Sequence, residues 1–110
     1  MQVAIKSHGV EISDRARSMV ERKFRFALTR FSPQLRRVAV KLTDANRPCG
    51  GNDKVCSVTL KFKDGRDARA VARADRFATA AAAVAERAAR VASRMIERDR
   101  TARHRSRSAP

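Results

Sequence analysis

Two stretches of this chain alternate strictly between apolar and polar residues, and this pattern constrains the fold more than any other feature. One covers residues 36–43 and the other leads from Lys54 into the Asp64-Gly65 pair; their apolar members are Val38, Val40 and Leu42, then Cys56, Val58, Leu60 and Phe62. Successive side chains of a β-strand point to opposite faces, so each stretch is predicted to be a strand with one apolar face. A sheet of such strands needs a cover on one side, whereas the other side stays in water and carries Arg37, Lys41, Lys61 and Lys63.

Two helices are predicted to supply that cover. In the first, Ser13 offers an N-cap and Asp14 a carboxylate in the first turn, and the helix is expected to end before Pro33. Its apolar stripe consists of Ala16, Val20, Phe24, Ala27 and Phe31. The second helix is predicted from about residue 76 to about residue 100. A short strand over residues 2–6 precedes the first helix, because Val3 and Ile5 share one side of it.

Residues 66–74 leave two alternatives open. Their alanine-rich sequence favours a helix, and apolar residues at helical spacing from Ala70 to Met95 would allow one helix over residues 66–100. However, Asp64-Gly65 is a strong hairpin signal, and Asp75 is suited to cap a helix that starts just after it. One long helix would also leave the preceding strand with an unpaired edge. We therefore favour a fourth strand over residues 66–73, although the residues alone are compatible with either.

The predicted order of elements is β-α-β-β-β-α. It indicates an α+β fold of two layers, a two-layer sandwich in which one four-stranded, antiparallel-rich sheet has two helices on one face. A chain of 110 residues has room for one core. We assign residues 1–100 to this domain and residues 101–110, which have no apolar stripe, to a flexible basic C-terminal tail.

The charge of the chain indicates a polyanionic partner. There are 26 Lys and Arg against 11 Asp and Glu, which gives a net charge of +15. Of the 26 basic residues 20 are Arg, whose planar guanidinium suits bidentate binding of phosphate. The excess lies at the two ends of the chain, with +7 in residues 1–43, +2 in residues 44–75 and +6 in residues 76–110. Nucleic acid is the leading candidate for the partner.

The basic residues of the two predicted helices are the candidate contacts. On the second helix a stripe beside the buried face consists of Arg87, Arg90, Arg94 and Arg98. Like charges at this spacing destabilise a helix, which favours anion binding over a merely solvated surface. The candidates on the first helix are Arg22, Lys23, Arg25 and Arg30, and Arg103, Arg105 and Arg107 of the tail would add unspecific attraction. Phe26 lies outside the apolar stripe, and we expect it to contact the neighbouring helix rather than to stack on bases.

Other functional classes have little support in the sequence. There is no run of 18 apolar residues and no signal peptide, so we expect a cytoplasmic protein with no membrane partner. His8 and His104 are isolated and no nucleophile setting or P-loop is present, so we expect no enzyme, small-molecule substrate or cofactor. Cys49 and Cys56 do not supply a zinc site. Cys56 is predicted to be a buried hydrophobe and Cys49 an exposed thiol, which leaves a thiol redox sensor as a weaker alternative.

Several short motifs occur in an order that resembles one protein family. The opening Met1–Ile5 is followed by Gly9–Ser13, Arg17 and Val20–Phe24. Further along come a loop with Leu42–Asn46 and Gly50–Lys54, and an Asp-x-aromatic-Ala motif at Asp75–Ala78. Together these resemble the ribosome hibernation promoting factors, also called ribosome-associated translation inhibitors or sigma-54 modulation proteins; the loop resembles that of a bacterial subgroup. The resemblance covers roughly residues 1–98.

The resemblance implies a fold similar to that of double-stranded-RNA-binding domains, with residues 66–74 as a strand, in a short form made of this domain alone. It also implies binding to the small ribosomal subunit, in the channel of mRNA and tRNA, which keeps idle ribosomes inactive under stress. Arg22 and Lys23 lie in a matching segment, whereas the candidates on the second helix rest on their position on its face. We expect a monomer off the ribosome. A general RNA or DNA chaperone without ribosome specificity is the alternative function.

Overall fold

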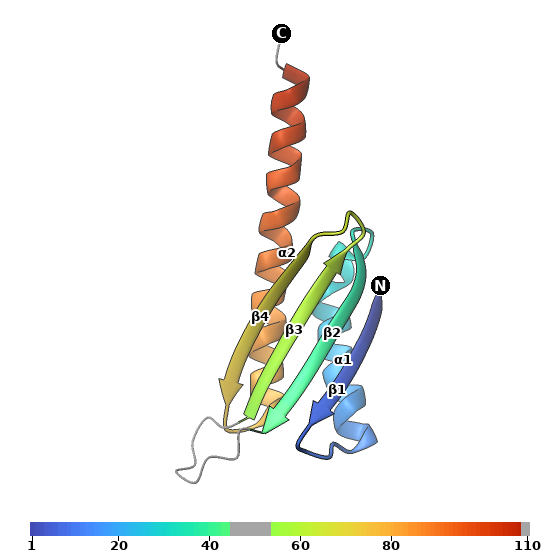
Figure 1. Cartoon of the computed structure of the whole chain (residues 1–110), viewed down its shortest axis with the longest axis vertical. Coiled ribbons are helices and arrows are strands. Elements are labelled where there is room, and N and C mark those ends of the chain that lie inside the picture. Colours follow the sequence, from blue (N-terminus) through green and yellow to red (C-terminus); the bar gives the residue numbers. More distant parts are fainter. Residues whose placement is uncertain (45–53, 109–110) are drawn as a thin grey trace.

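The structure is a computed structural model that describes the backbone of residues 1–44 and 54–108, with side chains described in these ranges as far as residue 98. Its elements are β1 (Gln2–His8), α1 (Asp14–Leu28), the 3-10 turn η1 (Thr29–Phe31), β2 (Leu35–Asp44), β3 (Lys54–Phe62), β4 (Asp67–Ala74) and α2 (Phe77–Ser108). The predicted order and the α+β class are confirmed (Figure 1). Cys49 and the loop around it lie outside the described residues.

The four strands form one sheet in the order β1-β2-β3-β4. β1 runs parallel to β2, since α1 carries the chain from one to the other, whereas β2–β3 and β3–β4 are antiparallel. The two alternating stretches pair in register, with Val40 opposite Val58 and Leu42 opposite Cys56. These four side chains are all buried. The apolar members of both strands therefore share one face, as the alternation predicts.

The alanine-rich segment after the hairpin is a strand, so the alternative of one helix over residues 66–100 is wrong. The backbone N–H of Phe62 donates to the carbonyl of Arg66 at 2.9 Å, and that of Gly65 donates to the carbonyl of Phe62 at 3.1 Å. Gly65 has a φ of 95°, which glycine adopts without steric cost. Ala72 and Ala74 are buried, and β4 packs against α2. Tertiary pairing and burial thus override the low strand propensity of alanine.

Both helices pack on the same face of the sheet, and the core lies between the two layers. Its largest members from α1 are Phe24 and Leu28, and α2 contributes Val84 and Ala88. No polar or charged side chain is buried among the residues whose side chains are described. The charged side chains in this part of the chain are therefore at least partly exposed, and they lie on the helices, on the open face of the sheet and in the connections between elements.

The ends of α1 follow the prediction, whereas α2 is longer than predicted. The Oγ of Ser13 accepts a hydrogen bond from the backbone N–H of Ala16 at 3.1 Å, and the helical segment closes with η1 before Pro33. α2 continues to Ser108 instead of ending near residue 100, and it extends beyond the sheet in Figure 1. Residues 101–108 contain neither Gly nor Pro, so no helix breaker interrupts them. The flexibility of residues 101–110 stays a prediction.

Two phenylalanines on α1 provide a test of this packing. Phe24 is 0% exposed and Phe26 is 90% exposed. Replacing Phe24 with Ala should lower the free energy of unfolding by about 3–5 kcal/mol, because it opens a cavity in the core. Replacing Phe26 with Ala should change it by less than about 0.5 kcal/mol, because water already surrounds the ring. Urea denaturation of both variants measures the difference, and equal effects would contradict the arrangement of α1.

Candidate nucleic-acid interface

The structure places all eight candidate contacts of the two helices on the helical layer. Arg22, Lys23 and Arg25 lie on α1, Arg30 lies in η1, and Arg87, Arg90, Arg94 and Arg98 lie on α2. Lys23 is half-buried and the other seven are exposed. The side chains of Arg103, Arg105 and Arg107 lie outside the described residues. The helical layer therefore presents a broad cationic surface.

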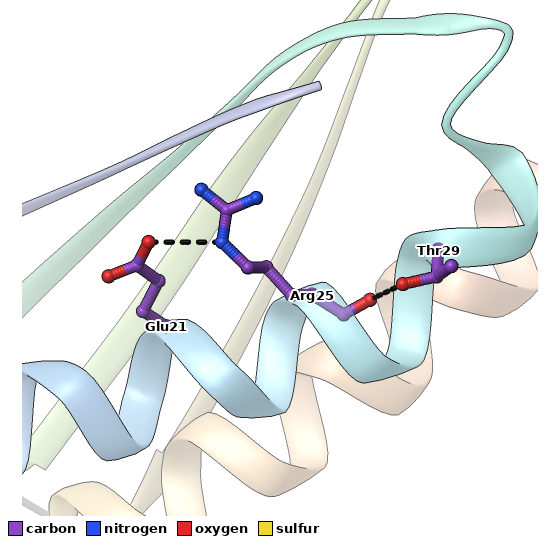
Figure 2. A network of polar contacts seen from close by, with 3 residues as sticks. All are labelled: Glu21, Arg25 and Thr29. Atoms are coloured by element: carbon purple, nitrogen blue, oxygen red, sulfur yellow. Dashed lines mark hydrogen bonds and ion pairs between the residues drawn. The ribbon is translucent and has the colours of Figure 1, made fainter.

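Two of the candidates on the first helical segment have internal partners. The Nε of Arg25 lies 3.0 Å from Oε1 of Glu21, one turn earlier, and the hydroxyl of Thr29 donates to the backbone carbonyl of Arg25 (Figure 2). The guanidinium of Arg30 lies over the ring of Phe31, 4.6 Å from its centroid. The Arg25–Glu21 pair and the Arg30–Phe31 contact are solvent-accessible and weak. A phosphate could therefore replace Glu21 as the partner of Arg25 or bind Arg30 beside Phe31.

The arginines of α2 also differ in whether they have a partner within the domain. The guanidinium of Arg87 turns back to the sheet and donates to the carbonyl of Val71 in β4. Nη2 of Arg90 lies 3.3 Å from Oε1 of Glu86, in an exposed pair. Arg94 and Arg98 make no ion pair or side-chain hydrogen bond with the residues whose side chains are described. The predicted stripe of four is therefore uneven, because Arg87 helps to hold the edge of the sheet.

Another arginine, which was not a candidate, has a structural role. A guanidinium nitrogen of Arg17 donates to the backbone carbonyl of Ile5, so it joins α1 to β1. This bond is part-buried, and it explains the half-buried state of the side chain.

A hollow lies between α1 and α2 on the outer side of the helical layer. It has a volume of about 310 Å³ and is lined by Lys23, Phe26, Ala27, Ala82, Ala85, Glu86 and Ala89. Phe26 borders this hollow with 90% of its surface exposed. The expectation that the neighbouring helix packs against this ring is therefore wrong, since the facing alanines are too short to cover it. An exposed aromatic ring thus lies among the basic residues of the interface.

The described residues contain no other constellation that suggests chemistry. They include no group of three or more His, Cys, Asp and Glu that could hold a metal ion. In the same part of the chain, neither helix has a stretch long and apolar enough to cross a bilayer. Cys56 is 0% exposed, which confirms the prediction of a buried hydrophobe. Burial raises the pKa of its thiol to about 12, so the reactive thiolate is scarce at neutral pH.

The sequence profile of the family described as sigma 54 modulation protein / S30EA ribosomal protein matches residues 3–100. The chain belongs to that family. A search of curated protein sequences gives no significant match.

Two solved structures have a similar fold. A ribosomal subunit interface protein from Coxiella burnetii is 16% identical, with a TM-score of 0.71 over 88% of this chain and 99% of that one. The N-terminal domain of Protein Y from Thermus thermophilus is 18% identical, with a TM-score of 0.70 over 86% of this chain and 99% of that one. At these identities the likeness shows a shared fold.

The thiols allow a direct test of the buried core of the domain. In a Cys49→Ser variant the one remaining thiol is Cys56, which should not react with a thiol reagent at pH 8 while the protein is folded. The same variant in guanidinium chloride should react fully and serves as the control. Rapid labelling of the folded protein would contradict the burial of Cys56 and would reopen the redox-sensor alternative.

Proposed function

We propose that this chain binds the small ribosomal subunit through ribosomal RNA, occupies the channel of mRNA and tRNA, and keeps idle ribosomes inactive under stress. Membership of a family described as ribosomal supports the ribosome as the binding partner. The exposed arginines of the helical layer support the mode of binding, and this is the observation that carries the proposal. The protein acts by occupancy alone, as a translation inhibitor in the cytoplasm rather than as an enzyme.

The contacts differ in their partners within the domain. Arg22, Arg94 and Arg98 are exposed and have no described ion pair, so they can bind phosphates without breaking a bond. Arg25 and Arg90 exchange an exposed carboxylate for a phosphate, which costs less than about 1 kcal/mol. Lys23 acts from the hollow between the two helices, whereas Arg30 and Arg87 also contact the ring of Phe31 and the carbonyl of Val71. Arg103, Arg105 and Arg107 add unspecific attraction.

The net charge also bears on the state of the protein off the ribosome. A charge of +15 on 110 residues opposes self-association in the absence of an anion. We therefore propose a monomer in solution, which meets RNA as one domain.

A charge reversal on α2 tests the proposal. Arg90→Glu with Arg94→Glu should abolish co-sedimentation with small ribosomal subunits, because two attractive contacts become repulsive. Lys63→Glu with Arg76→Glu changes the net charge equally at two other exposed positions and should retain most of the binding. Unchanged sedimentation of the α2 variant would contradict the assigned surface.

The carboxylate of Glu86 gives a test in the opposite direction. It lies 3.3 Å from Arg90 and in the hollow beside Phe26, so it should repel an approaching phosphate. Glu86→Gln should strengthen binding to small subunits by up to about fivefold, since an exposed pair contributes up to about 1 kcal/mol. The measurement is a filter-binding titration at fixed salt. Unchanged binding of the variant would mean that this part of α2 does not face RNA, and weaker binding would contradict the repulsion by Glu86.

A general RNA or DNA chaperone is the second candidate, because a net charge of +15 attracts any nucleic acid. Both functions predict binding that weakens steeply with salt. Competition separates them, because a ribosome-specific factor should prefer small subunits to an excess of tRNA or duplex RNA. Equal affinity for the three would establish the chaperone.

A further inference from the structure

A second basic surface lies on the open face of the sheet, away from both helices. In Figure 1 the strands lie in front of the helices, and this face is toward the viewer. It holds a hollow of about 450 Å³ whose floor is made of the small side chains of Ala4, Ala39, Ser57 and Thr59. The charged residues that line this hollow are all basic: Lys6, Arg37, Lys41 and Arg69, with His8 at one end.

The strand register explains how these residues meet. Ala4, Ala39, Thr59 and Arg69 form one row across the four strands. In the neighbouring rows, Lys6 lies opposite Lys41, and Arg37 lies opposite Lys61. The small side chains of Ala4, Ala39 and Thr59 in the central row, with Arg69 at its end and long basic residues in the rows on either side, produce a trough. Lys6 and Arg69 join this surface through the pairing of β1 and β4, which no single segment of the sequence reveals.

The charge on this face is unbalanced. Among the residues of the four strands that point to the open face, one is acidic, Asp67, which lies opposite Lys61. Six are basic: Lys6, Arg37, Lys41, Lys61, Arg69 and Arg73. Like charges directly opposite each other destabilise a sheet. The pairs Lys6–Lys41 and Arg37–Lys61 therefore lower stability unless an anion lies between them.

The dimensions of the trough define the anion. Arg37 and Lys41 are four residues apart on β2, which separates them by about 13 Å at about 3.3 Å per residue. One phosphate group can contact both only if the two side chains bend toward each other, whereas an extended chain of phosphates can contact both as they stand out from the sheet. The one aromatic ring of the lining is the imidazole of His8 at one end of the hollow, so recognition is mainly of backbone charge and through the hydroxyls of Ser57 and Thr59.

We propose that this trough binds the phosphodiester backbone of an unpaired RNA strand. The domain then contacts RNA on both faces, with the helical layer on one wall of the ribosomal channel and the open sheet on the other. This two-sided arrangement rests on the proposed function, whereas the trough itself can be tested without ribosomes.

Binding of a fluorescent 12-residue oligouridylate tests the trough. Arg37→Glu with Lys41→Glu should weaken binding at least tenfold more than the control pair Arg15→Glu with Arg76→Glu, which changes the net charge equally at exposed positions off this face. The variant should also lose about 1.4 from the slope of log affinity against log salt, at about 0.7 for each contact with a single strand. Equal affinity of variant and control, or no binding by the unaltered protein, would overturn the proposal.

Three further measurements make the outcome unambiguous. Arg37→Gln with Lys41→Gln removes the charges without reversing them. This variant should fold with an unchanged circular dichroism spectrum, and its affinity for oligouridylate should fall by the same order of magnitude. In NMR, the amide signals of Ala39 and Thr59 should shift with oligouridylate, whereas shifts confined to α1 and α2 would overturn the proposal. Oligoglutamate of equal length should bind more weakly, and equal binding would overturn the choice of a phosphodiester.

The two proposals fail in different ways. If the unaltered protein does not sediment with small subunits, the proposed function fails, while the oligouridylate titration still decides the trough. If the sheet variant binds oligouridylate like its control, the trough fails, while the Arg90→Glu with Arg94→Glu variant still decides the helical surface.

Discussion

Burial of the apolar face of the sheet beneath α1 and α2 is the constraint on which the rest of the structure depends. Phe24 and Leu28 of α1 and Val84 of α2 are fully buried against the inward side chains of the strands. Among the side chains described, none that is polar or charged is buried with them. Stability therefore comes from apolar area and packing, at about 25 cal/mol for each Å² removed from water. The excess of positive charge has to lie outside.

This separation produces two cationic surfaces of different form. The helical layer carries long arginines on exposed helix faces, together with the exposed ring of Phe26. The open sheet carries a trough with small side chains on its floor and basic side chains around it. The first suits an RNA surface with phosphates and unstacked bases, and the second suits a single backbone. A channel with RNA on more than one side would contact both surfaces.

Much of the fold could be predicted from short-range patterns. The alternation in β2 and β3 and the Ser13 cap are local, and each appears in the structure as predicted. The alanine-rich β4 was harder, because its pairing with β3 outweighs its propensity. The end of α2 was predicted too early, because the apolar stripe stops near residue 100. The helix nevertheless continues to Ser108, since no Gly or Pro interrupts it.

The candidate interface was predicted less well, since contacts between elements decide it. The predicted helices correctly place the eight basic residues on the helical layer, but the face geometry of the second helix could not show that Arg87 turns to the carbonyl of Val71. It also could not show that the alanines of α2 leave Phe26 uncovered. The trough follows from the strand register, so it is invisible in any single segment.

A structure of this chain bound to the small ribosomal subunit, determined by electron cryomicroscopy, would test the central claim most directly. The account predicts density for the domain in the channel of mRNA and tRNA, with Arg90, Arg94 and Arg98 of α2 facing ribosomal RNA phosphates. Density elsewhere on the subunit, or a domain in the channel with the outer face of α2 turned to solvent, would contradict it.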